Sequence, residues 1–232
     1  MPVSTQSAYP PGVVAVPSGH LSRYTAFWIS LFSLQVPPGS RVSLTQGVSV
    51  GENLNISVRN MLIPNPEMQW VFILGDDHTF RSDILMQLLA HDKDIVVPLC
   101  PLRSLPFKPS VFKDRPNGSC TAIEWSEIPM EGLTPIDGTG YAGGLFKRIV
   151  FDTVKDPWWD MGPMGSSKYP LWGEDLWFCR KVRDAGFTIL LDPTIPVGHI
   201  TTTILNPIRT EEGGWGVALD VGHQGASPPP AD

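Results

Sequence analysis

Residues 70–78 read WVFILGDDH, and this stretch decides the fold. The run from Trp70 to Leu74 is apolar at every position, which is typical of a strand covered on both faces in a parallel sheet. It ends at a glycine followed by two adjacent carboxylates, Asp76 and Asp77. Open α/β folds bind ligands at the carboxyl ends of their parallel strands. The stretch therefore predicts a central strand that delivers two aspartates to a ligand-binding edge.

Strand and helix signals alternate on both sides of this stretch. Apolar or β-branched runs predict strands at residues 12–17, 41–44, 94–99 and 188–191. Helical periodicity and end signals predict helices at residues 21–34, 54–62, 82–91, 148–154 and 174–185. Such alternation indicates a parallel sheet with right-handed crossovers. We expect an α/β fold with a mainly parallel central sheet flanked by helices.

The domain is expected to span residues 12–212 as a single unit. Residues 1–11 are interpreted as an N-terminal extension, and the Gly-rich residues 213–232, which end in ASPPPAD, as a mobile C-terminal tail. The tract 101–135 is rich in proline and polar residues and matches no assignable pattern.

Composition narrows the class of partner and the compartment. The formal charge of -6 over 232 residues argues against a broad phosphate-binding surface for nucleic acid. Three scattered cysteines without a CxxC pair indicate neither a zinc knuckle nor a disulfide framework, which favours a reducing cytoplasm. The N-terminus lacks signal-peptide features, and the apolar stretch 24–36 is too short to span a bilayer. We expect a cytoplasmic protein without stable membrane insertion.

Two acidic pairs and one histidine are the candidates for chemistry. Asp76 and Asp77 offer the oxygens that hard divalent cations prefer, although a solvated turn uses aspartate equally often. Glu174 and Asp175 begin a helix, where a carboxylate serves either as a cap or as a general base. His199 follows Gly198 and a strand; it is either a structural residue or a nitrogen ligand, and as a ligand it would favour Mn²⁺ over Mg²⁺.

The order of these motifs resembles that of a known enzyme class. FILGDDHTF at 72–80 precedes GTGYAGGLFKR at 138–148, GEDLWFCRKVRDAGF at 173–187 and GHI at 198–200, and ISVRN at 56–60 lies upstream. This arrangement resembles the GT-A glycosyltransferases, in particular the short single-domain enzymes similar to family two that occur in bacteria and their viruses. The resemblance covers about residues 12–205 and implies a Rossmann-like fold. Gly75 stands where many relatives have a further aspartate.

The resemblance also implies a role for each matching residue. Asp77 and His199 would bind the metal, with Asp76 or His78 as further possible ligands. Asp175 would be the base of an inverting reaction, and Glu174 would orient it or touch the acceptor. The donor would be met by Pro17, Ser18, Gly19, Arg59 and Asp76. Trp158, Trp159 and Trp172 are expected on the acceptor side, where aromatic faces can stack on sugar rings.

The function expected is transfer of a sugar from a nucleotide diphosphate, such as a UDP-sugar, to a hydroxyl group. A protein, a glycan, a small molecule or a modified DNA base all stay open as acceptor, and a viral origin would make the host cytoplasm the compartment. One alternative is a non-catalytic module that binds nucleotide sugars. A sugar-1-phosphate nucleotidyltransferase is less favoured, because Pro17-Ser18-Gly19-His20 replaces the basic phosphate loop that such enzymes need.

Overall fold

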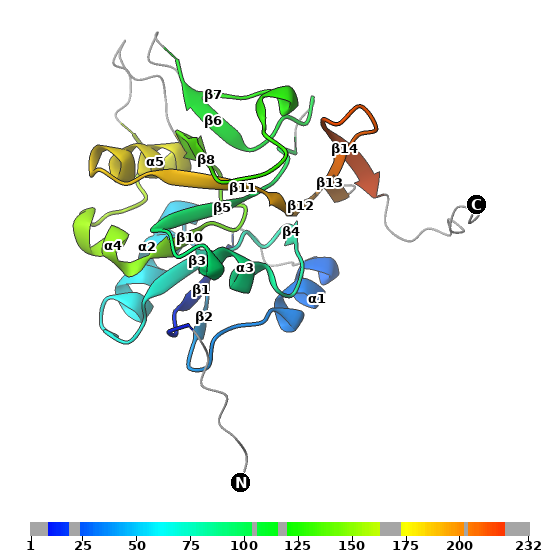
Figure 1. Ribbon diagram of the computed structural model, residues 1–232. Helices are drawn as coiled ribbons and strands as arrows, with labels where there is room; N and C mark the ends of the chain where they lie inside the picture. The colour runs from blue at the N-terminus through cyan, green and yellow to red at the C-terminus, as the bar shows by residue number, and fades with distance from the viewer. Residues whose placement is uncertain are drawn as a thin grey trace.

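A seven-stranded sheet forms the centre of the protein (Figure 1). The computed structural model describes residues 9–18, 24–103, 106–115, 120–162, 173–201 and 204–220. The order of the strands across the sheet is β2-β1-β3-β10-β5-β11-β8. Their bounds in that order are Arg41–Gln46, Val13–Ser18, Trp70–Ile73, Leu145–Lys147, Ile95–Leu99, Ile189–Pro196 and Thr134–Ile136.

The sheet is mostly parallel, as the sequence predicts, but its layout is not a regular Rossmann arrangement. Strands β2, β1, β3, β5 and β11 run in one direction, whereas β10 and β8 run in the other. Strand β10 lies between β3 and β5, and Gly143 and Gly144 directly precede it. Gly143 has a φ of +104°, a conformation that glycine adopts without strain.

Helices cover both faces of the sheet (Figure 1). Their bounds are α1 Thr25–Ser33, α2 Val50–Ser57, α3 Ile84–Ala90, α4 Arg148–Thr153 and α5 Glu174–Asp184; a π-helical turn at Val58–Leu62 continues α2, and a 3-10 turn spans Trp125–Glu127. The Ser49 hydroxyl caps α2 by accepting a hydrogen bond from the Glu52 amide. Among the described residues, no helix is long and apolar enough to cross a membrane.

The side chains of each central strand alternate between the two covered faces of the sheet, which explains why these strands are apolar at every position. In β1, Val13 and Ala15 belong to one core cluster, while Val14 and Val16 belong to the other. Successive side chains of a strand point to opposite faces, so a strand covered on both faces needs apolar residues at every position. One cluster is completed by α2, α4 and α5, and the other by α1 and α3.

Two smaller sheets extend the central one. The first has three strands in the order β7-β6-β9. Strands β6 (Val111–Asp114) and β7 (Cys120–Ala122) belong to the tract 101–135, which matches no assignable sequence pattern, and β9 (Gly138–Thr139) follows that tract. The other sheet has the order β14-β13-β12-β4. Its strands are β14 Trp215–Asp220, β13 Ile204–Arg209, β12 Gly198–Ile200 and β4 His78–Thr79.

The two predicted chain ends need correction where the structure describes them. The prediction of a mobile tail from residue 213 is wrong for β14, which pairs with β13 after a turn in which Gly213 has a φ of +79°. Trp215 packs against the core and lies under the Arg209 guanidinium, 5.6 Å from the ring centroid. At the other end, the Pro10 carbonyl accepts the Trp70 indole N–H, so the chain is already docked on the sheet there. Residues 1–8 and 221–232 lie outside the described part.

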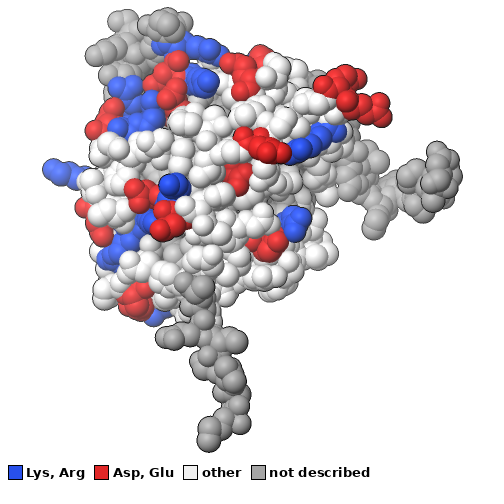
Figure 2. Space-filling view, in the orientation of Figure 1, with Lys and Arg blue, Asp and Glu red and all other residues white. Residues whose placement is uncertain are grey.

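Figure 2 shows one face of the molecule. On the described residues of that face, basic and acidic side chains lie interspersed, without a continuous basic patch.

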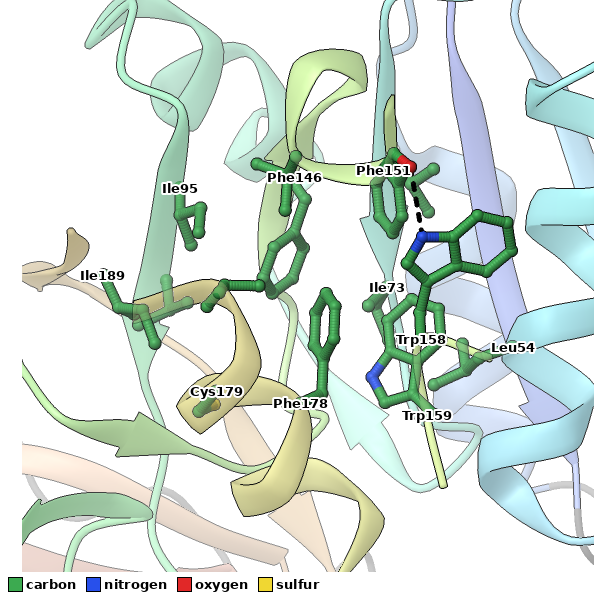
Figure 3. Close-up of a cluster of buried hydrophobic side chains, with 14 of the residues drawn as sticks. Leu54, Ile73, Ile95, Phe146, Phe151, Trp158, Trp159, Phe178, Cys179 and Ile189 are labelled. Atoms are coloured by element: carbon green, nitrogen blue, oxygen red, sulfur yellow. Dashed lines mark hydrogen bonds between the residues drawn. The ribbon is translucent and has the colours of Figure 1, made fainter. Parts of the chain in front are cut away.

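Trp158 and Trp159 lie in the core, which corrects their predicted role in binding an acceptor (Figure 3). Their exposed fractions are 4% and 2%. The Trp158 indole N–H is hydrogen-bonded to the Phe151 and Val154 carbonyls, and the Trp159 ring packs 4.4 Å from that of Phe178. An adjacent pair of tryptophans can stack on a sugar only from the surface, so these two stabilise the fold instead. Trp172 lies outside the described residues.

We expect Phe178→Ala to destabilise the protein by about 3–5 kcal/mol, because it empties the centre of this aromatic cluster. The matched control is Phe32→Ala, also in a helix but 82% exposed, for which a change within about 0.5 kcal/mol is expected. Urea unfolding of both variants measures the two effects. Equal losses would show that the cluster is not the centre of the core.

Candidate functional site

A cavity of about 280 Å³ opens at the carboxyl ends of the parallel strands. Segments far apart in the sequence line it: the end of β1, the acidic turn after β3, the loop after β5, residues 140–142, the start of α5, and β12. Its lining includes Pro17, Asp76, Asp77, His78, Arg103, Ser110, Tyr141, Asp175 and His199. Asp76, Asp77, Asp175 and His199 therefore line one cavity at the carboxyl ends of the parallel strands, where open α/β folds bind ligands.

A larger cavity of about 580 Å³ lies at the opposite edge, around Trp70, Lys93, Lys147 and Arg148. Its lining carboxylate, Asp92, is paired with Lys147. The smaller cavity gathers the imidazoles and carboxylates, so the chemistry belongs there.

Strand pairing brings His199 to the acidic turn. Strand β12 runs antiparallel to β4, and in this register His199 lies directly opposite His78. Directly opposed residues of an antiparallel pair have their side chains on the same face. The two imidazole rings accordingly stack with centroids 4.5 Å apart.

The Asp77 carboxylate contacts three side chains that line the cavity. Its Oδ1 lies 3.0 Å from His78 Nδ1, and its Oδ2 lies 3.4 Å from His199 Nε2 and 2.9 Å from Arg103 Nη1. Burial opposes ionisation of this carboxyl, but hydrogen bonds and positive charge from the two histidines hold its pKa well below the usual range. Asp77 is therefore an ionised carboxylate throughout the physiological range.

The two histidines have one ring nitrogen each committed to the backbone. His199 Nδ1 lies 2.8 Å from the Pro101 carbonyl, and His78 Nδ1 lies 3.2 Å from the Gly75 carbonyl. A backbone carbonyl at Nδ1 fixes the orientation of the ring and turns Nε2 away from the backbone, which is how metal-binding histidines are commonly oriented. His78 Nε2 is buried and has no hydrogen-bond partner.

This orphaned nitrogen is the observation that tests the site for a metal. A buried polar atom without a partner costs free energy unless a ligand satisfies it. The residues around it supply carboxylate and imidazole, both ligands of divalent cations. Asp77, His78 and His199 therefore fit a cation, with Asp76 on the lining of the same cavity.

Asp175 lies on the wall of the same cavity, in the first turn of α5. Its Oδ1 accepts a hydrogen bond from the Leu176 amide at 2.7 Å. Burial, helped by the charge of Glu174, raises the pKa of this carboxyl. The neighbouring Tyr141 hydroxyl is buried without a hydrogen-bond partner. Asp175 thus combines a raised proton affinity with access to the cavity, as a general base requires.

Of the residues predicted for the donor, Pro17 and Asp76 line the cavity, and Ser18 is buried at the end of β1. Arg59 does not line it. Its guanidinium instead pairs with Asp156 at 2.6 Å and Glu52 at 2.7 Å, and the hydrogen bond to Asp156 leads the effects that raise its pKa. Gly19 lies outside the described residues.

Arg103 and Cys100 are site residues that sequence reasoning missed. Both follow β5, so the rule that singled out the residues after β3 applies equally to them. Arg103 lines the cavity and pairs with Asp77, whereas Arg59 does not reach the cavity. Cys100 is buried, and its sulfur lies with His78 and His199 in a group whose ligand atoms are all within 4.8 Å of one another.

Comparisons with known proteins support the fold. No family model matches the chain, and no curated protein matches it. Among solved structures, A197 from STIV is similar over 94% of this chain and 98% of its own, with a TM-score of 0.59 and 14% identity. A structure of GalNAc-T7 with UDP, GalNAc and Mn²⁺ covers 75% of this chain and 33% of its own, with a TM-score of 0.48 and 12% identity. This second likeness is too weak to support a functional assignment. The likeness to A197 shows that the two chains share a fold.

Proposed function

We propose that the protein is a metal-dependent glycosyltransferase that moves a sugar from a nucleotide diphosphate to an acceptor hydroxyl with inversion at the anomeric carbon. The observation that supports it is the single cavity lined by the Asp77–His199 cluster on one side and Asp175 on another. Transfer from a nucleotide sugar needs both a cationic group for the leaving diphosphate and a base for the attacking hydroxyl.

Asp77, His78 and His199 would hold the divalent cation, and Mn²⁺ is favoured over Mg²⁺ because imidazole is among the ligands. When bound, the cation supplies Lewis-acid stabilisation of charge on diphosphate oxygens. Arg103, which reaches Asp77 and lines the cavity, would add a second positive charge for the same diphosphate. Pro17 and Ser18 end β1 beside this position and would contact the nucleotide.

Asp175 would accept the proton of the attacking hydroxyl. Its pKa is raised, so the carboxylate binds a proton more readily than an exposed aspartate does. Glu174, the preceding residue, would keep the field around Asp175 negative and thereby help to maintain its raised pKa. These two carboxylates are on α5, whose buried face packs into the aromatic cluster and fixes the helix against the sheet.

A donor screen tests the proposal. Purified protein is incubated with a panel of nucleotide-diphosphate sugars and Mn²⁺, and release of the nucleotide diphosphate is measured with and without EDTA. We expect release from at least one donor, lost on chelation and restored by added Mn²⁺. Donor binding without hydrolysis or transfer, across donors and acceptors, would instead identify a non-catalytic binding module.

The pH dependence of transfer follows from Asp175. A base acts only when ionised, so the rate should fall as the pH drops through its raised pKa, which places the acidic limb above the value of about 3.9 for a free aspartate. The stability of the folded protein changes with pH in the opposite direction to the rate. A pKa that is raised in the folded state stabilises the fold while Asp175 is protonated, and this contribution is lost as the pH rises through that pKa. The Asp175→Asn variant should therefore gain stability relative to the wild type at neutral pH but not at low pH. Thermal unfolding at both pH values tests the sign.

A further inference from the structure

Cys100 completes a group of donor atoms that differs from a plain carboxylate site. Its sulfur is gathered with one nitrogen each of His78 and His199, all within 4.8 Å of one another. The side chain is 1% exposed, and its hydrogen bond to the Pro101 carbonyl is long, at 3.5 Å. A buried thiol commonly serves only as a small apolar group. Here, however, two imidazoles face it.

The geometry around the two histidines leaves a position for a ligand beside their rings. Both Nδ1 atoms lie within hydrogen-bonding distance of backbone carbonyls, which turns both Nε2 atoms away from the backbone. His78 Nε2 is buried without a partner, and the residue is 4% exposed. A bound ion would satisfy this nitrogen.

The spacing of the three donor atoms can be compared with that around a bound ion. Two ligand atoms about 2.1 Å from one tetrahedral zinc lie about 3.4 Å apart. The donor atoms of Cys100, His78 and His199 lie within 4.8 Å of one another, so small side-chain rotations would bring them to this spacing.

We propose that Cys100 is a metal ligand and that, with His78 and His199, it forms a site for a thiophilic divalent ion of the Zn²⁺ class. This inference deepens the proposed function, on which its catalytic meaning rests. Thiolate and imidazole bind zinc-like ions more tightly than Mn²⁺, and both kinds of ion accept imidazole. The sulfur would therefore give a site that accepts Mn²⁺ in the proposed reaction a higher affinity for Zn²⁺.

Cobalt spectroscopy tests the proposal without any enzymatic assay. The full chain is stripped with a chelator and titrated with Co²⁺, whose bond to a thiolate gives a charge-transfer band in the near ultraviolet. We expect the band in the wild type and in the matched control Cys179→Ser, whose buried thiol bonds the backbone of Thr139 instead. The band should be absent from Cys100→Ser, with Zn²⁺ affinity lowered about 100-fold or more, since even outer-shell partners are worth 10–100-fold.

A second measurement needs no substitution. X-ray absorption at the zinc edge of the wild-type protein should show one sulfur at about 2.3 Å beside nitrogen or oxygen at about 2.0–2.1 Å. Cobalt or zinc binding without sulfur, or a Cys100→Ser variant with unchanged spectrum and affinity, would overturn the proposal.

The experiments can refute the role of Cys100 without refuting the proposed glycosyltransferase activity, and the reverse. Mn²⁺-dependent transfer that is intact in Cys100→Ser, with no charge-transfer band in the wild type, overturns the role of Cys100 and leaves the glycosyltransferase standing. A clear band with no turnover of any nucleotide sugar supports the site and overturns the proposed reaction.

Discussion

Replacing Asp175 by asparagine is expected to lower sugar transfer by about 10²- to 10⁴-fold, the usual contribution of a general base. Asparagine has nearly the same shape and keeps an oxygen for the Leu176 amide, so the helix start should be preserved. It cannot accept a proton at neutral pH. Donor binding should persist, because the groups proposed to hold the cation and diphosphate are Asp77, His199 and Arg103. Single-turnover transfer and donor titration, run side by side, separate the two effects.

The matched control for Asp175→Asn is Asp184→Asn. Asp184 ends the same helix, pairs with Arg180 four residues earlier, and is 59% exposed at its side chain. Exposed pairs of this kind contribute little, so activity and stability should both stay close to those of the wild type. Near-normal transfer by Asp175→Asn would remove this carboxylate from the mechanism.

Replacing Asp77 by asparagine is expected to weaken binding of a divalent cation about 100-fold or more and to abolish transfer. This carboxylate contacts His78, His199 and Arg103, so neutralising it removes a proposed ligand and the charge that orients the others. Outer-shell partners alone are worth 10–100-fold in metal affinity, and a direct ligand should exceed that. Calorimetric titration with Mn²⁺ and with Zn²⁺ measures the loss directly.

The control for Asp77→Asn is Asp83→Asn, which removes a surface pair with Arg81 outside the cavity. Metal affinity of this control should match that of the wild type. Circular dichroism and thermal unfolding show whether each variant is folded, since breaking a buried charged pair can cost about 3–5 kcal/mol. A folded Asp77→Asn protein with unchanged affinity, with and without prior EDTA treatment, would refute the metal role.

The parts of the fold that sequence predicted are those with a strong local cause. The apolar run 70–74 is the central strand β3, because only a strand covered on both faces needs such a run. Helix α5 starts at Glu174 and is followed by Gly186 with a φ of +93°, as its end signals predict. The antiparallel β10 was not foreseen, since strand direction depends on the path of the chain through residues 101–144.

Pairing across long distances explains the errors in the predicted site. Arg59 looked like a diphosphate contact from its place in the chain, yet Asp156 and Glu52 hold it away from the cavity. Trp158 and Trp159 looked like a sugar platform because they lie in a Gly-rich aromatic segment. Local composition does not say which side of a loop faces the core, and here both rings face inward.

The sequence by itself predicted five strands of the central sheet and its flanking helices, the edge at which a ligand is expected, and the residues Asp77, Asp175 and His199 as candidates there. Each of these follows from local periodicity and from the general rule that parallel strands present their carboxyl ends to ligands. Only the tertiary structure decided that His199 lies opposite His78, that Cys100 lies beside these two histidines, and that Arg103 lines the cavity. Such contacts depend on strand register and loop path, which arise from packing of the whole chain and leave no mark on neighbouring residues.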